Sequence, residues 1–277
     1  MISNIPNKKI ITLTSDVGVW RYLKKCYSYR ELIWELVKKD IKVKYAQTRF
    51  GILLSVLQPV VGLLLFVYLF GRLLNLGSDG SPYPVFVFIG MMTWYYFSML
   101  VSSTGNSLIE SQHIIKKVYF PKLILPLSKV ISVLLEFLIW LGILVILLII
   151  YGITPTYRLI FFPLFLMLDI IAGLTVGIWL SAMSFYRRDI LHIIPYLVGL
   201  TIMVTPVFYP RVTIPVNVSY FLYFNPIAGI IQGFRWCITG NETFSIWYLP
   251  CFFVVLLMFY LSIVYFKKVE YRIAEKL

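Results

Sequence analysis

Six long apolar segments, separated by shorter polar stretches, dominate the chain after about residue 50. Each is long enough, or nearly so with its flanks, to cross the hydrocarbon layer of a membrane as an α-helix, which needs about 20 apolar residues. Helices are the expected form, because a spanning segment must satisfy its backbone hydrogen bonds internally. The pattern predicts an all-α integral membrane protein with a transmembrane domain over residues 52–266. The six predicted spans are residues 52–70, 85–101, 130–150, 159–185, 190–209 and 249–266.

The composition agrees with this class, since 60% of the residues are hydrophobic, 13% are charged and the mean hydropathy is +0.86. A soluble domain is nearer half apolar and a quarter charged. The net charge of +13 does not indicate a nucleic-acid partner, because the basic residues lie beside apolar segments.

The distribution of basic residues predicts the orientation. With both termini inside, 21 of the 25 lysine and arginine residues fall on the cytoplasmic side of six spans, as the positive-inside rule requires. Residues 1–27 then form a cytoplasmic N-terminal segment, since they lack an apolar core long enough for a signal peptide. Residues 267–277 form a cytoplasmic tail.

Residues 28–51 are expected to form an amphipathic interface helix. Ser28 and Glu31 have the spacing of a capping box, in which each side chain bonds a free N–H of the first helical turn. Apolar residues then recur at helical spacing, and four lysines lie between them. Such a helix should lie in the membrane interface with its lysines near lipid phosphates. The alternative is a solvent-exposed helix packed on a soluble domain, but no such domain remains in the chain.

The longest polar interruption in the first half of the apolar region is residues 105–129. Ser107 and Glu110 form a second capping-box spacing, which predicts that a short helix begins there. Pro121 lacks a backbone donor and is expected to end that helix. A short capped helix at a membrane surface, with basic residues and a proline exit, is suited to docking another protein. The alternative is an ordinary cytoplasmic loop.

Residues 215–236 are apolar but do not fit as a span. Asn225-Pro226 divides them into two pieces of about ten residues, which are too short to cross. Proline disfavours helical geometry at the preceding residue, so the break is local. We expect two short re-entrant helices that dip back from the outer face. The alternative is an amphipathic loop lying flat on that face.

Two carboxylates lie inside predicted spans, Glu136 in the third and Asp169 in the fourth. Acids within a membrane are functional candidates. Each lies near the middle of its span, so the two could approach and lock the third and fourth helices as a protonated or hydrogen-bonded pair, the interpretation we favour. Gly173, Gly177 and Ser181 form a ridge of small residues on the fourth span, which predicts close helix packing there.

No residue set indicates an enzyme or a metal site. His113 and His192 have no carboxylate or cysteine arrangement typical of catalysis or metal binding. The three cysteines lack metal-ligand spacing, and nothing in the sequence pairs Cys237 with Cys251, so free thiols are the expected state. The chain also lacks the Gly-x-x-x-x-Gly-Lys-Ser/Thr string that would hold nucleotide phosphates.

Three features together resemble a known family. They are the basic helix at 28–45, the string Ile-Lys-Lys-Val-Tyr-Phe-Pro-Lys at 115–122 with Leu-Pro-Leu-Ser at 125–128, and Asn225-Pro226 followed by Gly229 and Phe234-Arg235. The chain thereby resembles the permease subunits of type-2 ABC exporters that move polysaccharides such as O-antigen, capsule and teichoic acid. The resemblance runs from about residue 28 to 270.

The resemblance implies a homodimer in the bacterial inner membrane that works with two copies of a separate ATPase. ATP and magnesium would bind that partner, and this chain would bind no cofactor. The implied cargo is a lipid-linked polysaccharide, with an O-antigen-type glycan first, admitted when the first and fifth spans part. The 105–129 region would then carry the ATPase-coupling residues. These are Ser107, Glu110, His113, Ile114, Ile115, Lys116, Lys117, Tyr119, Phe120 and Pro121.

Aromatic residues make up 17% of the chain. Many are expected in interfacial belts, and some are candidates for lining a sugar path, because their apolar faces suit the C–H faces of sugar rings. The channel and gate candidates are Tyr68, Tyr196, Phe208, Tyr209, Tyr220, Phe221, Tyr223 and Phe224.

Two alternatives to polysaccharide export stay open. One is an ABC exporter of small molecules. The other is a membrane-embedded transferase acting on lipid-linked sugars, which an Asp-x-Asp or His-x-x-x-x-Asp pair would favour, and the sequence contains neither.

Overall fold

The computed structural model describes residues 18–46, 51–74, 76–78, 80–154, 156–184, 187, 189–211, 214 and 220–275. Every regular element within these ranges is a helix and none is a β-strand, which confirms the predicted all-α class. Residues 1–17, most of the predicted N-terminal segment, lie outside the described residues. So do residues 215–219 at the start of the predicted re-entrant region.

Five helical stretches are long and apolar enough to cross a membrane. They are α3 with its π-helical extension η2 (Gly51–Phe66 and Val67–Leu73), α4 (Tyr83–Glu110), α6 (Ile124–Ile150), the 3₁₀ turn η3 with α7 (Tyr157–Phe161 and Phe162–Ser184), and α11 (Leu249–Glu275).

The predicted segment 190–209 forms α8 (Ile190–Val204), whose 15 residues are fewer than a full span needs. The helix ends early because Thr205 precedes Pro206 and takes an extended conformation, as residues before proline do.

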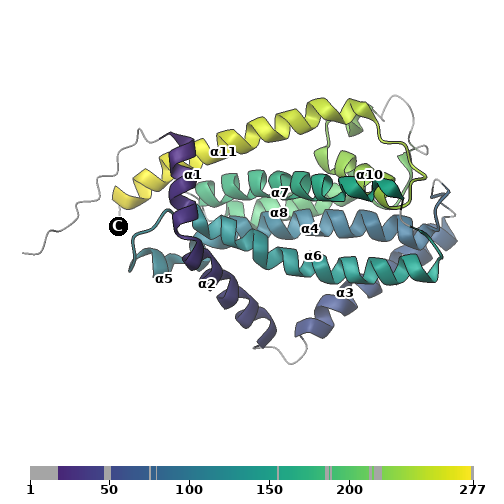
Figure 1. The fold of residues 1–277 in the computed structure, drawn as a ribbon, viewed down its shortest axis with the longest axis horizontal. Coiled ribbons are helices and arrows are strands. Elements are labelled where there is room, and N and C mark those ends of the chain that lie inside the picture. The colour runs from purple at the N-terminus through teal and green to yellow at the C-terminus, as the bar shows by residue number, and fades with distance from the viewer. Residues whose placement is uncertain are drawn as a thin grey trace, which may run out of the picture.

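Helix α4 is the centre of the bundle. It packs most extensively against α7 and α6, and Figure 1 shows α8 running alongside these helices while α11 lies along α7. The spanning window of α4 is 78% buried within the protein, whereas that of α3 is only 11% buried. Helix α3 therefore lies at the edge of the bundle.

Small residues bring α4 and α7 into contact. A Cβ atom at Gly177 would overlap Thr104 Oγ1, and one at Gly173 would lie 2.8 Å from Leu100 Cδ2. Across the same interface Gly105 leaves room for the side chain of Leu180. The predicted small-residue ridge on α7 is thus confirmed, and α4 is its partner.

The two ends of the bundle are defined here by the two ends of α4. At the Tyr83 end, the Tyr83 hydroxyl donates to Phe208 O at 2.7 Å and Arg158 Nη1 donates to Gly240 O at 3.0 Å. Asn241 Nδ2 donates to Gly80 O at 3.0 Å at the same end. The loops after α3, α6 and α8 therefore gather there, and the connection from α4 to α6 lies at the opposite Glu110 end.

The N-terminal region contains two helices where the sequence predicted one. They are α1 (Val19–Ser28) and α2 (Arg30–Ile41), and α2 continues into the π-helical turn η1 (Lys42–Ala46). The predicted capping box is wrong, because the Ser28 hydroxyl donates back to Lys24 O and no side chain caps α2. Leu36 and Val37 on α2 are buried, and α2 packs against α6.

The predicted break at Asn225-Pro226 is confirmed. Asn225 is the N-cap of α10 (Pro226–Ile238), where its Oδ1 accepts from the N–H groups of Ile227 and Ala228 at 3.0 and 3.4 Å. Pro226 suits the first helical position because the N–H it lacks would have no helical partner there. Nearly all of α10 is buried, and it packs against α4 and α7.

Candidate functional site

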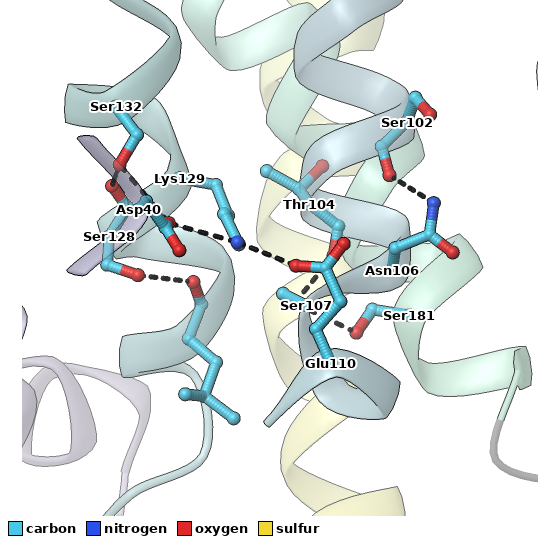
Figure 2. A network of polar contacts seen from close by, with 11 residues as sticks. Asp40, Ser102, Thr104, Asn106, Ser107, Glu110, Ser128, Lys129, Ser132 and Ser181 are labelled. Carbon is cyan, nitrogen blue, oxygen red and sulfur yellow. Dashed lines mark hydrogen bonds and ion pairs between the residues drawn. The ribbon is translucent and has the colours of Figure 1, made fainter. Parts of the chain in front are cut away.

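The candidate functional site is the connection between α4 and α6 at the Glu110 end, residues 111–123. It contains α5 (Gln112–Ile115), a single helical turn, followed by an irregular stretch. The predicted helix start at Ser107 is wrong, because α4 continues to Glu110. The buried Ser107 hydroxyl donates to Thr104 O at 2.6 Å within α4 and lies 3.5 Å from Ser181 Oγ of α7 (Figure 2).

The exposed part of this connection is basic with two apolar side chains. His113, Lys116 and Lys117 are exposed, Val118 is 56% exposed and Tyr119 is 37% exposed. The Lys25 ammonium lies 5.4 Å from the centre of the Tyr119 ring, so a residue of α1 borders the same surface. We call residues 113 and 116–119 the basic knuckle.

Apolar side chains on both sides of the basic knuckle anchor it. Phe120 and Pro121 are buried, and Ile114 and Ile115 are half-buried against a core of residues from α1, α7 and α11. The ten coupling residues predicted from the sequence therefore fall into three groups. Four are exposed on the knuckle, and Ile114, Ile115, Phe120 and Pro121 anchor it. Ser107 and Glu110 belong to the last turns of α4.

A buried carboxylate fastens the end of the connection. Glu270, near the end of α11, accepts from the Tyr22 hydroxyl and from the Lys122 backbone N–H, the latter at 2.9 Å. Burial raises the pKa of Tyr22 well above its ordinary value and lowers the pKa of Lys122. Both residues therefore lie in an environment of low polarity. Through these two hydrogen bonds Glu270 connects α11 to α1 and to the segment before α6.

A second polar cluster joins three helices beside Glu110. Lys129 Nζ of α6 lies 2.7 Å from Glu110 Oε2 of α4 and 2.9 Å from Asp40 Oδ2 of α2. The Ser132 hydroxyl also donates to Asp40, at 3.3 Å. Figure 2 shows Lys129 between the two carboxylates. Because the side chains of Lys129 and Asp40 are only 12% and 23% exposed, their ion pair is less weakened by water than a surface pair.

The two predicted intramembrane acids do not form a pair. Glu136 of α6 forms an ion pair with Lys44 of η1, beside a cavity of about 360 Å³ between η1, α4 and α6. Burial lowers the pKa of Lys44. Asp169 of α7 is fully buried, and its carboxylate oxygens have no hydrogen-bond partner among the described residues. The predicted pair is therefore wrong, and the partner of Glu136 is Lys44, a residue outside the predicted spans.

The predicted channel aromatics occupy different surroundings. Phe208 is buried. Tyr209 donates to the carbonyls of Met203 and Val204 at 3.1 and 3.0 Å, so it holds the end of α8. The ring of Tyr223 packs edge-on against Tyr248. The exposed members are Tyr68, Tyr196, Tyr220, Phe221 and Phe224.

The structure adds residues that sequence analysis missed. Asp40, Lys129 and Glu270 link elements that are far apart in the chain. In the sequence, the only sign of such a role is that each charged residue has an apolar neighbour. Among the described residues no cluster of three or more histidine, cysteine or acidic side chains could hold a metal ion. Cys26, Cys237 and Cys251 are free, as expected from the sequence.

Comparisons with known proteins agree with this architecture. Residues 31–239 match the family model described as ABC-2 type transporter. The chain is 29% identical over 217 residues to the O-antigen export system permease protein RfbA of Myxococcus xanthus, covering 78% of this chain and 83% of that protein.

Two further relatives cover more of the chain. An O-antigen export system permease protein RfbA of Klebsiella pneumoniae is 28% identical over 247 residues, with 88% of this chain and 94% of the relative covered. The polysialic acid transport protein KpsM of Escherichia coli is 24% identical over 236 residues, with coverages of 82% and 90%. The family match spans three quarters of the chain, from α2 through the basic knuckle to the end of α10, and the chain therefore belongs to the ABC-2 type transporter family.

Proposed function

We propose that this chain is the permease subunit of an ATP-driven exporter that moves a lipid-linked polysaccharide of the O-antigen type across the bacterial inner membrane. The observation that carries the proposal is the match to O-antigen export permeases over nearly their whole length. The polysialic acid transport protein is less similar to this chain, so export of a capsule polysaccharide is the second candidate. The chain works as a homodimer with two copies of a separate ATPase, which binds ATP and magnesium.

We also propose six spans, with α8 as the fifth. Helix α7 ends near the Glu110 end of the bundle, where Ser181 approaches Ser107. Helix α8 begins shortly afterwards, and the segment that follows it reaches Tyr83 at the other end. Its 15 residues cover about 22 Å at 1.5 Å per residue, and the five residues after it supply the remaining length. Side chains from α4 and α10 satisfy the irregular backbone there, as a membrane requires.

The charge distribution supports placing the Glu110 end in the cytoplasm, with residues 28–51 as the interface helix and residues 215–236 as a re-entrant element at the outer face. Lys38, Lys39 and Lys42 are exposed on this helix and suit contact with lipid phosphates. The exposed aromatics Tyr220, Phe221 and Phe224 would then lie at the outer mouth, where a sugar chain leaves.

The orientation predicts the reactivity of two single cysteines in a cysteine-free background. Gly77 is exposed after η2 and has open space around it, and Lys117 is exposed on the basic knuckle. We expect Gly77→Cys to react with an impermeant thiol reagent in intact cells, and Lys117→Cys to react only after permeabilisation. Labelling of Lys117→Cys in intact cells would contradict the cytoplasmic placement of the knuckle.

In the proposed mechanism the ATPase binds the basic knuckle and moves it during each cycle of ATP binding and hydrolysis. Two routes lead from the knuckle into the bundle. One passes through Lys122 and Glu270 into α11, and the other passes through Glu110 and Lys129 into α6 and α2. The spans α3 and α8 then part to admit the glycan.

Deletion of the gene tests the function in the cell. We expect the polysaccharide to disappear from the cell surface and to accumulate inside on its lipid carrier, because synthesis continues while export stops. Immunoblotting of surface and total lipid-linked glycan measures both pools. Loss of both pools would favour the transferase alternative, and an unchanged surface pool would overturn the proposal.

A further inference from the structure

The segment that follows α8, residues 205–209, is held by side chains from two other helices, one buried and one half-buried. Arg235 of α10 is 3% exposed and donates from Nη1 to Pro206 O at 3.0 Å and from Nη2 to Val207 O at 2.8 Å. The Tyr83 hydroxyl donates to the next carbonyl, Phe208 O, at 2.7 Å. Three consecutive carbonyls beyond the end of α8 are therefore satisfied by side chains, which fixes the path of this backbone.

Two residues of α4, Phe86 and Gly90, accommodate the Arg235 side chain and the 205–209 segment. Nε and Nη2 of Arg235 also donate to Phe86 O, both at 3.2 Å, and the guanidinium lies 3.4 Å from the centre of the Phe86 ring. A Cβ atom at Gly90 would lie 2.9 Å from both Arg235 Nη2 and Val207 O. A glycine is thus required where the arginine and the carbonyl approach α4. Glu242 lies 3.7 Å from Arg235 Nε and offsets part of its charge.

The fixed segment presents one ring to α3. Phe208 stacks on Phe66, the last residue of α3, with ring centres 4.0 Å apart, and on Phe70 of η2 with centres 5.1 Å apart. Helix α3 is otherwise the least buried of the spans. The stack of Phe66, Phe70 and Phe208, which we call the aromatic joint, therefore connects the Tyr83 ends of α3 and α8.

We infer that Arg235 is a positioning residue that keeps the aromatic joint closed, so that α3 and α8 stay together at their outer ends. Its planar fork is needed because three carbonyls in different directions must be held at once. The consequence for transport rests on the proposed function: a gap between α3 and α8 opens first at the cytoplasmic end, and the outer end separates only when residues 205–208 move.

The test is the distance between α3 and α8 in nanodiscs without ATP or glycan. Spin labels on cysteines at Tyr68 of η2 and Met203 of α8, both exposed, report the separation in a background without native cysteines. Arg235→Lys keeps the charge but loses the fork. We expect the population at the parent distance, relative to the population at longer distances, to fall about tenfold, because buried carbonyls lose their donors. Gly90→Ala should lower the same population ratio, since the new methyl group displaces Arg235 or Val207.

The control is Arg158→Lys, the same change in another arginine at the Tyr83 end, which donates to Gly240 O and lies over the Trp236 ring. Among the described residues it makes no hydrogen bond to residues 205–209. It should leave the distances unchanged. If Arg235→Lys does not fold, Phe208→Ala removes the ring and keeps the arginine contacts, and the same shift is expected, whereas Phe208→Trp should restore the parent distances.

A folded Arg235→Lys or Phe208→Ala protein with parental distances overturns the inference, even if its melting temperature falls, because the arginine would then contribute only stability. The measurement needs neither ATPase nor glycan, so it is independent of the proposed function. If the variants show longer distances but the parent protein exports no glycan, the role of Arg235 in the aromatic joint is supported and the export proposal is contradicted.

Discussion

Changing both Val118 and Tyr119 to Asp should abolish association of the ATPase with this protein while leaving the permease folded in the membrane. Both side chains are exposed on the basic knuckle, and neither belongs to the main core of the bundle. A small docking contact depends on a few apolar anchors, and losing each costs about 2 kcal/mol or more. Two anchors together correspond to a loss of about a thousandfold in affinity or more. Copurification of the ATPase with a tagged permease measures this loss of binding.

The matched control is Gly77→Asp, which places a charge on an exposed residue of the loop after η2, where an added Cβ atom meets nothing within 4 Å. It should keep the ATPase bound. Changing Ile114 and Ile115 to Asp is less informative, because these residues pack against the core beneath the knuckle and the change would also destabilise the fold. If the Val118 and Tyr119 double variant retains the ATPase within about twofold of the parent affinity, about 0.4 kcal/mol, the docking surface lies elsewhere.

The sequence predicts the features that depend on local physical chemistry. Five of the six apolar segments appear as long helices because their length and continuity leave few alternatives in a membrane. The break at Asn225-Pro226 follows from the same logic, since proline constrains its neighbour and asparagine caps the helix that follows. Gly173 and Gly177 mark a close helix contact, although the sequence does not identify α4 as the partner.

The two capping boxes show where local reasoning stops. Serine followed three residues later by glutamate is found at Ser28 and at Ser107, and in neither place does the serine cap a helix. Each hydroxyl instead bonds back to a carbonyl of the helix that contains the serine. At Ser107 the neighbouring Ser181 of α7 also favours continuation, and no sequence spacing reports that contact.

The polar residues that connect the helices could not be predicted, because their partners lie far apart in the chain. Asp40 and Lys129 are almost ninety residues apart, and Tyr22 and Glu270 are separated by 248. In the count of basic residues on each side of the membrane, Arg235 is only one of the outer charges. In the structure its side chain is buried and donates hydrogen bonds to backbone carbonyls. Such pairings depend on tertiary packing, which a single sequence does not specify.

The central claim is that this chain forms the membrane path through which an ATPase drives polysaccharide export. Sealed vesicles containing the permease and its ATPase, with the ATP site facing outward, test it most directly. Lipid-linked O-antigen-type glycan added from outside should become protected from a glycan-degrading enzyme only when hydrolysable ATP is present. The protected amount should fall to background with the Val118 and Tyr119 double variant and stay at the parent level with Gly77→Asp. Equal protection with and without ATP, or in vesicles that lack the permease, would contradict the account.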